Sequence, residues 1–285
     1  MKKSILVLLS LLFVSSGCGW INTTGGRSVI YGEDDRVDIY QVENKDVLKN
    51  ASAVGSMWEI SDVEDMRNGN SSLRTIDFGT AYNLIYSEPF RSQPVGAFCT
   101  VFLVAPDVVV TAGHCTNRAN YKNKLVVFGY RMNNKTVPNL TIPTSDVYKI
   151  KEVLGWNLSG STGSDFAVLQ LDRKVAGITP LKVSTKTVKW LDYVYVLGHP
   201  CGLPLKYAPN GKVESSLFDA YFNASVDTYG GNSGSPIFNK CHEVVGILVR
   251  GETDFTTDNT GRRRSARGVS GESVTRVSEW IKFVK

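Results

Sequence analysis

The chain has 285 residues, of which 42% are hydrophobic and 21% are charged, and its formal net charge is +5. These proportions are typical of globular proteins and argue against a largely disordered chain, and the length is enough for one large domain or two small ones. A basic cluster occurs at residues 262–264, but no long basic stretch is interleaved with aromatic residues. Nucleic-acid binding is therefore not predicted.

Residues 1–18 have the pattern of an export signal. Two lysines precede an apolar run over residues 5–14, which matches a signal-peptide core and is too short for a membrane-spanning helix of about 20 residues. The run ends in Ser-Ser-Gly-Cys, which resembles the lipobox of bacterial lipoproteins except that Ser15 stands where Leu is usual. The resemblance implies an exported cell-envelope lipoprotein whose only membrane contact is a lipid on Cys18. Plain secretion is the alternative.

Residues 19–80 are predicted to be a tether followed by an N-terminal arm. The segment 19–30 is short and polar, as flexible linkers are, and the sequence that follows has weak periodicity up to about residue 90. One or two strands and a short helix around Val47–Val54 are expected in the arm. The main domain is placed at residues 81–285.

From residue 97 onward, short apolar runs alternate with Gly, Pro, Asn and Asp. The runs predicted to be strands are Phe98–Val104, Val108–Ala112, Lys124–Gly129, Phe166–Leu171, Val194–Leu197, Ser235–Phe238 and Val244–Val249. Many short strands separated by turn signals favour an all-β sandwich or barrel. A helical spacing of apolar residues is clear only in Ser273–Lys285, which predicts one helix at the C-terminus.

Three segments carry residues suited to amide hydrolysis, which needs a nucleophile, a base, a group that holds the base, and oxyanion donors. The run Tyr-Gly-Gly-Asn-Ser-Gly-Ser-Pro at 229–236 sets Ser233 between glycines, which permit a tight turn and close approach of a substrate. The run Thr-Ala-Gly-His-Cys at 111–115 places His114 after an apolar strand. Asp165 starts another strand, where a partly buried carboxylate needs a partner such as an imidazole. Taken singly, each segment also fits an ordinary loop or a structural residue.

In the order His, Asp, Ser, these segments resemble the trypsin/chymotrypsin family over about residues 80–285. The Gly-Asn-Ser-Gly-Ser-Pro run is similar to that of the bacterial V8/glutamyl-endopeptidase branch. The resemblance implies two six-stranded antiparallel β-barrels with a C-terminal helix. It implies a serine endopeptidase in which Ser233 attacks, His114 takes its proton and Asp165 orients the imidazole. The backbone N–H groups of Gly231 and Ser233 would form the oxyanion hole.

The cysteine count agrees with export. With Cys18 set aside as the lipid site, four cysteines remain, an even number that suits two disulfides but leaves three pairings open. The family resemblance implies a Cys99–Cys115 bridge that closes the histidine loop, and leaves Cys201–Cys241 as the second pair. No metal or cofactor is implied because the triad needs neither. The expected partners are protein or peptide substrates of a monomer.

Two features point to different substrate preferences. Asp227 falls where trypsin-like enzymes place the acid of the specificity pocket, which favours a basic residue before the scissile bond. The Asp-Thr-Tyr-Gly-Gly run that includes Thr228 is instead similar to glutamyl endopeptidases, which prefer acidic residues. In that branch a pocket histidine holds the substrate carboxylate, and Leu248 takes its place here, so a basic residue is slightly favoured. The remaining residues expected to line the pocket are Val249, Arg250 and Gly251.

Asn232 distinguishes this chain from its animal relatives. Asn232 stands where the animal enzymes carry the Asp that pairs with a new N-terminal amine, so that activation switch is not predicted. His199 and His242 are interpreted as structural.

The alternative function is a surface lipoprotein that keeps the protease fold as a binding module. Such proteins usually lose a triad or oxyanion residue, and this chain retains all of them.

Overall fold

The structure, a computed structural model, describes residues 30, 34–251, 253–267 and 271–284. The predicted signal segment, its Cys18 and most of the tether lie outside these residues. In the part of the chain that is described, no helix is long and apolar enough to cross a membrane.

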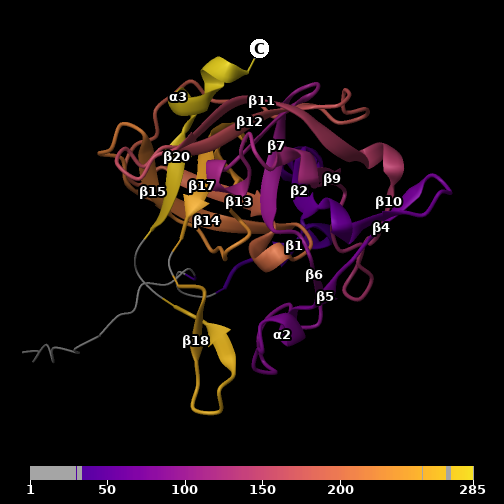
Figure 1. The fold of residues 1–285 in the computed structure, drawn as a ribbon. Coiled ribbons are helices and arrows are strands. Elements are labelled where there is room, and N and C mark those ends of the chain that lie inside the picture. Colours follow the sequence, from indigo (N-terminus) through magenta and orange to yellow (C-terminus); the bar gives the residue numbers. More distant parts are fainter. Residues whose placement is uncertain (1–29, 31–33, 252, 268–270, 285) are drawn as a thin grey trace, which may run out of the picture.

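Six strands close into a first barrel, in the spatial order β11-β12-β8-β7-β2-β9 (Figure 1). Their bounds are Val54–Glu59 (β2), Cys99–Ala105 (β7), Val108–Thr111 (β8), Lys124–Phe128 (β9), Val147–Leu158 (β11) and Asp165–Leu171 (β12). All neighbouring strands are antiparallel. Nearly every side chain of β7, β8, β9 and β12 is buried, which is why these apolar runs form strands of the barrel.

Seven strands form a second sheet, in the order β1-β14-β13-β16-β17-β20-β15, and an added β14–β15 pairing closes six of them into a barrel. Their bounds are Val37–Asp38 (β1), Tyr193–Gly198 (β13), Lys206–Ser215 (β14), Tyr221–Ser225 (β15), Pro236–Asn239 (β16), Val244–Arg250 (β17) and Glu272–Arg276 (β20). The prediction of two six-stranded antiparallel barrels is confirmed.

The remaining elements are short and lie around the barrels. The α-helices within the described residues are Lys45–Ser52 (α1), Phe78–Ala81 (α2) and Val277–Trp280 (α3). Three small sheets comprise Val63–Asp65 (β3), Asn70–Leu73 (β4) and Thr141–Pro143 (β10); Ile76–Asp77 (β5) and Pro94–Val95 (β6); Phe255–Thr257 (β18) and Arg263–Ser265 (β19). The C-terminal helix is present but shorter than its apolar spacing suggested, because the first residues of that segment belong to β20.

The first barrel begins before residue 81. β2 pairs with β7 on one side and with β9 on the other, so it is an integral strand of the barrel. The expected division between residues 19–80 and 81–285 therefore cuts through this barrel. One or two strands were expected in the arm, but this one was not located because its residues, Val-Gly-Ser-Met-Trp-Glu, include Gly and Ser at buried positions and show no alternation.

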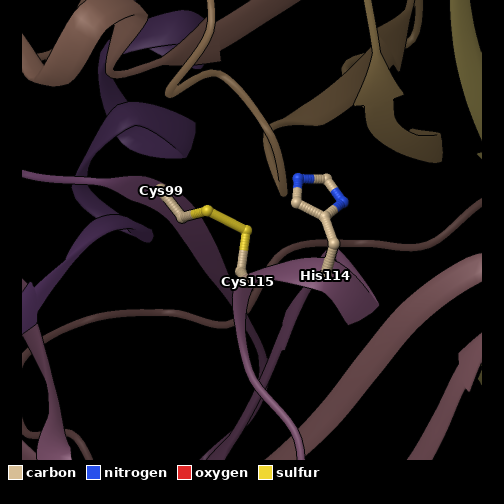
Figure 2. A group of neighbouring side chains, drawn as sticks. All are labelled: Cys99, His114 and Cys115. Carbon is tan, nitrogen blue, oxygen red and sulfur yellow. A yellow bond between two sulfur atoms is a disulfide. The ribbon is translucent and has the colours of Figure 1, made fainter.

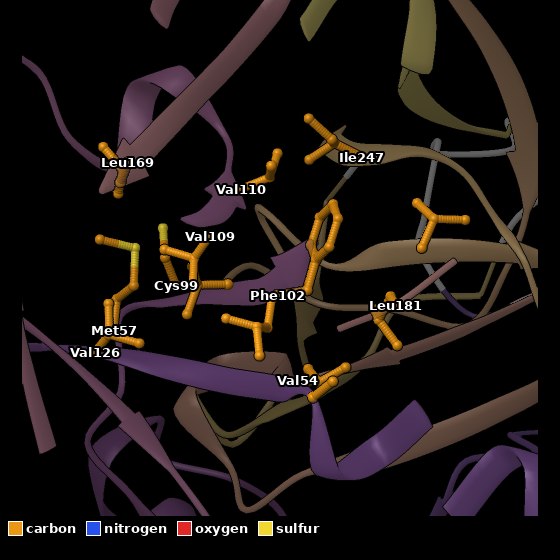
Figure 3. Packing of buried hydrophobic residues seen from close by; sticks show 14 of the residues in the cluster. Val54, Met57, Cys99, Phe102, Val109, Val110, Val126, Leu169, Leu181 and Ile247 are labelled. Atoms are coloured by element: carbon orange, nitrogen blue, oxygen red, sulfur yellow. The ribbon is translucent and has the colours of Figure 1, made fainter. Parts of the chain in front are cut away.

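One apolar cluster joins the two barrels. Phe102 and Val110 of the first barrel belong to the same buried cluster as Ile247 of the second (Figure 3). Trp280 of α3 is fully buried and meets Phe102 edge to face, with 5.9 Å between the ring centroids. Because close-packed interiors resist deformation, this contact holds residues of one barrel at a defined position relative to the other.

The cysteines pair differently from the expectation. The Cys99–Cys115 disulfide is present, which confirms that bridge. Cys201 and Cys241 are both free, the first buried and the second exposed, so the predicted Cys201–Cys241 disulfide is wrong. β13 and β16 are antiparallel neighbours, and Cys201 follows the end of β13 whereas Cys241 follows the end of β16. The two thiols therefore lie at opposite ends of this strand pair, beyond the roughly 7 Å limit between Cα atoms.

Candidate active site

Asp165 and His114 form a tight pair in the first barrel. The Asp165 side chain, the first of β12, is only 3% exposed, and its Oδ2 lies 2.8 Å from His114 Nδ1. Its Oδ1 accepts hydrogen bonds from the backbone N–H groups of Gly113 at 2.6 Å and His114 at 3.2 Å. These bonds use both carboxylate oxygens and occupy Nδ1, so Nε2 is the ring nitrogen left for proton transfer.

The backbone around His114 is held by a turn and a disulfide. β8 ends at Thr111, and Gly113–Cys115 form a single 3₁₀ turn. A Cβ at Gly113 would lie 2.2 Å from the Asn157 carbonyl oxygen, so only glycine fits between the turn and β11. Figure 2 shows His114 beside the disulfide that ties the next residue to the start of β7. The histidine side chain itself remains 37% exposed.

Ser233 lies on the loop between β15 and β16 of the second barrel. Gly231 and Gly234, on either side of it, both have φ of +89°, a backbone conformation that favours glycine. The Ser233 carbonyl accepts a hydrogen bond from the Thr100 N–H at 2.9 Å and lies 3.7 Å from Cys115 Sγ. The loop is thereby fastened to β7, and the Ser233 backbone lies beside Cys115, the residue that follows His114.

The backbone N–H groups of Gly231 and Ser233 have no acceptor among the described residues. Their neighbours in the loop are bonded, since the N–H of Asn232 reaches Tyr229 O at 3.1 Å and that of Ser235 reaches Asn232 O at 2.8 Å. Two unbonded N–H groups on a glycine-rich turn beside a serine are suited to bind a developing oxyanion.

A cavity of about 130 Å³ opens beside Ser233. The predicted pocket residues Val249, Arg250 and Gly251 line it. Asp227 and Thr228 do not line it, although both are buried. Asp227 Oδ2 instead accepts a hydrogen bond from the Asp35 N–H at 3.1 Å.

Two acidic residues line this cavity that were not among the predicted site residues, Asp254 and Glu272. The Asp254 carboxylate accepts the Gly230 N–H at 3.0 and 3.1 Å, and burial raises its pKa. Glu272 is 1% exposed and starts β20. Asp165 was singled out because it starts an apolar strand, whereas β20 after Glu272 reads Glu-Ser-Val-Thr-Arg and gives no such signal. No local signal marks Asp254.

His199 and His242, interpreted as structural, each have a partner outside the Asp165–His114 pair. His199 is 1% exposed, its Nδ1 lies 2.9 Å from the Leu203 carbonyl oxygen, and its ring stacks on Tyr130. Burial lowers the pKa of His199 to about 3, so its imidazole is neutral at ordinary pH. His242 Nδ1 lies 2.9 Å from the Tyr195 hydroxyl, and His242 follows β16 whereas Ser233 precedes it.

The chain also matches a known protein family. A family model described as the trypsin-like peptidase domain matches residues 99–247, just over half of the chain. The chain belongs to the trypsin-like peptidase family. The matched span of this trypsin-like peptidase contains all three triad candidates.

The individual relatives have low sequence identity to this chain. A glutamyl endopeptidase from Bacillus licheniformis is 26% identical over 236 residues, which cover 75% of this chain and 70% of the relative. An extracellular metalloprotease from Bacillus subtilis is 26% identical over 210 residues, 69% of this chain but only 60% of that protein. A solved Glu endopeptidase in complex with MPD has a TM-score of 0.52 at 19% identity, covering 90% of this chain and 97% of the other. That last likeness shows the shared fold.

The name of the Bacillus subtilis relative raises the question of a metal centre. Within the described residues, the His, Cys, Asp and Glu side chains close enough to share an ion are Cys99, His114 and Cys115, whose ligand atoms lie within 4.8 Å (Figure 2). The two sulfurs are joined to each other, so they offer no thiolate. One imidazole is left, which is fewer ligands than a protein zinc site uses.

Proposed function

We propose that this trypsin-like peptidase is an exported serine endopeptidase in which Ser233 is the nucleophile, His114 the general base and Asp165 the group that orients the base. The observation that carries the proposal is the buried Asp165–His114 pair, with 2.8 Å between Oδ2 and Nδ1. The second support is the position of the Ser233 loop. The Ser233 carbonyl accepts a hydrogen bond from the Thr100 N–H, next to the Cys99–Cys115 bridge.

In the first half of the proposed reaction, His114 Nε2 takes the proton of Ser233 Oγ while Oγ forms a bond to the carbonyl carbon of the substrate. The carbonyl electron pair moves to its oxygen, and the N–H groups of Gly231 and Ser233 donate to that oxyanion. Asp165 stabilises the imidazolium. The imidazolium then gives its proton to the leaving amine as the C–N bond breaks, which leaves an ester on Ser233.

In the second half, His114 removes a proton from a water molecule that attacks the ester. The same two N–H groups hold the second oxyanion, and Ser233 Oγ leaves with the proton from His114. The free carboxylic acid product then departs. Every proton in this scheme passes through His114, which is why a histidine with one fixed and one free ring nitrogen supports the proposal.

We propose a preference for a basic residue before the scissile bond. Acidic side chains line the cavity beside Ser233, and the apolar Leu248 also lines it, where the glutamyl-endopeptidase branch would carry a histidine. The sequence similarity to a glutamyl endopeptidase supports the alternative preference for an acidic residue. A carboxylate entering this cavity would meet two carboxylates, which is electrostatically unfavourable.

The decisive experiment uses a fluorophosphonate probe, which reacts with an activated serine. The wild-type protein is expected to be labelled and Ser233→Ala is expected to carry no label. Ser235→Ala is the matched control, because the buried Ser235 hydroxyl donates to Asn232 Oδ1 and should not react. An unlabelled wild-type protein would contradict the enzyme and support the binding-module alternative.

Export and the lipid anchor are proposed from the first 18 residues, with Cys18 as the acylated residue. Metabolic labelling with palmitate should mark the wild-type protein and leave Cys18→Ala unlabelled. Cys241→Ala is the control, since Cys241 is exposed and free. Equal incorporation into the wild type and Cys18→Ala would rule out the anchor and leave plain secretion.

A further inference from the structure

Trp156 of β11 is bonded to the turn that carries His114. Its indole Nε1–H donates to the Gly113 carbonyl and to the Thr116 carbonyl, both at 2.8 Å. Gly113 starts the 3₁₀ turn immediately before His114, and Thr116 is the residue at which the turn ends. One N–H group therefore joins the beginning of this turn to its end.

Asp165 holds the same turn through different atoms. Its Oδ1 accepts the backbone N–H groups of Gly113 and His114, whereas Trp156 donates to backbone carbonyls. The two side chains come from neighbouring strands, since β11 pairs with β12 and places Trp156 opposite Ala167. The turn is thus bound to two adjacent strands, through its N–H groups to β12 and through its carbonyls to β11.

Apolar burial distinguishes Trp156 from the tryptophans of the core. Trp156 is 40% exposed, whereas Trp58 and Trp280 are fully buried. Trp280 is buried although its Nε1 has no hydrogen-bond partner among the described residues. An exposed indole leaves in water the apolar area that a core position would remove from it. Trp156 thus combines incomplete burial with two hydrogen bonds, and both bonds go to the turn of His114.

An indole N–H is well suited to hold a backbone beside a base. It is a donor only, and it carries no charge, so it restrains the turn without adding a titratable group next to His114. An Arg or Lys side chain in the same place would bring a positive charge near an imidazole that has to accept a proton, and would disfavour the imidazolium. Trp156 leaves the electrostatics of the imidazole to Asp165.

Building on the proposed role of His114 as general base, we propose that Trp156 is a positioning residue, whose Nε1–H keeps the His114 turn where the imidazole can reach Ser233. A general base must lie about 2.6–3.2 Å from the atom whose proton it takes. A displacement of about 1 Å costs up to about 100-fold in rate. Trp156 acts through the backbone of the turn, and no contact with the reacting atoms is assigned to it.

The rate of fluorophosphonate labelling measures how well His114 activates Ser233. In Trp156→Phe, which removes the N–H and keeps an aromatic ring, we expect this rate to fall about 10-fold. The analogue 3-benzothienylalanine at position 156 should cause a similar loss, because it keeps the two-ring shape and has sulfur in place of the N–H. Trp190→Phe is the matched control, since Trp190 is 67% exposed, and it should be labelled at the wild-type rate.

Peptide hydrolysis tests the same assignment through the division of the effect between kcat and KM. On a peptide that the wild type cleaves, Trp156→Phe should lower kcat and kcat/KM equally, with KM unchanged to within about 2-fold. This outcome is expected because alignment of the base affects the transition state and not the binding of the substrate. A raised KM with the wild-type kcat would mean that Trp156 binds substrate, and would overturn the inference.

A double-mutant cycle separates positioning of His114 from an unrelated loss of activity. In Asp165→Asn the imidazole is already misoriented, so adding Trp156→Phe should lower the labelling rate by less than about 2-fold further. If Trp156→Phe lowers the rate by the same factor with and without Asp165, the two residues act independently and the inference is wrong. Far-UV circular dichroism establishes that each variant is folded, and the sulfur analogue preserves the ring shape if Trp156→Phe does not fold.

The remaining outcomes distinguish this inference from the proposed function. Labelling of both Trp156 variants at the wild-type rate overturns the inference and leaves the proposed function intact. Slow labelling of Trp156→Phe with normal labelling of the sulfur analogue also overturns it, since ring packing and not the N–H would carry the effect. A wild-type protein that carries no label overturns the proposed function itself.

Discussion

The two barrels hold their halves of the site by different means. In the first barrel, His114 is bound by a buried carboxylate, two backbone hydrogen bonds to that carboxylate and an adjacent disulfide. In the second, Ser233 lies on a turn of glycines at positive φ, and the cavity beside it is walled by side chains from separate segments. The half that would move protons is fixed by side-chain contacts, and the turn that carries Ser233 is shaped by its backbone.

This difference bears on how each half tolerates change. A base must keep one nitrogen oriented to within hydrogen-bond geometry, so every contact of Asp165 matters. A substrate cavity needs only a shape and a charge, which different residues can supply. Asp254 and Glu272 line the cavity beside Ser233, and Asp227 does not.

The largest effect is expected from breaking the first-barrel half with Asp165→Asn. The amide can donate to His114 Nδ1 and would hold the imidazole in the wrong tautomer, so kcat should fall by about 10⁴-fold. Steady-state kinetics on a peptide with Lys before the scissile bond measures it. Asp172→Asn, an exposed acid just after the same strand, should keep the wild-type kcat. An equal loss in both variants would contradict the assigned role of Asp165.

A smaller loss is expected from breaking the second-barrel half with Gly231→Ala. Alanine is strained at a φ of +89°, and its Cβ would lie 2.8 Å from the His199 carbonyl oxygen. The N–H of residue 231 would be displaced, and kcat should fall by about 10²–10³-fold. Gly177→Ala is the matched control, because Gly177 also has positive φ but has no neighbour within 4 Å. Unchanged kcat in Gly231→Ala would exclude this N–H from the oxyanion hole.

The first-barrel half contains a disulfide, whereas Cys241 in the second barrel is free. Replacing these cysteines should therefore change the free energy of unfolding by different amounts. Replacing Cys99 and Cys115 by alanine opens a link between residues separated by 16 positions and should lower the free energy of unfolding by about 3 kcal/mol. Chemical denaturation without reductant measures it. Cys241→Ser should leave stability unchanged, since Cys241 is exposed and unpaired. Comparable destabilisation by Cys241→Ser would mean that this cysteine does pair.

The smallest effect concerns His199, which lies next to the Ser233 loop. Its folded pKa of about 3 is below the unfolded value of about 6.5, so between these pH values only the unfolded chain binds the proton. Stability should therefore fall with decreasing pH, by about 1.4 kcal/mol per pH unit for this group. Denaturation of His199→Asn from pH 6.5 to 4.5 should show a shallower slope than the wild type. An identical slope would show that His199 titrates normally.

The strands that were predicted from sequence share one property. β7, β8, β9, β12, β13, β16 and β17 are nearly continuous apolar runs, which are visible without any knowledge of neighbours. β11 and β14 were not predicted. Both have alternating buried and exposed residues, and β14 contains Pro209 and Gly211. Their place in the barrels depends on pairing with distant strands, which local composition does not encode.

The sequence by itself determined the family, the two barrels and the candidates Ser233, His114 and Asp165, because each depends on a short run of residues with particular backbone demands. Residue 113 must be glycine because a Cβ there would collide with β11. Gly231 and Gly234 must adopt positive φ. Such demands are local, and a motif records them.

Only the tertiary structure decided which acids face the cavity and which cysteines meet. Asp227 is near Ser233 in sequence and yet bonds Asp35, whereas Asp254 and Glu272 reach the cavity from beyond β17. Cys201 and Cys241 form an even pair by count and are kept apart by the antiparallel β13–β16 register. Distances between residues far apart in the chain are set by strand pairing and core packing, and these lie outside any single stretch of sequence.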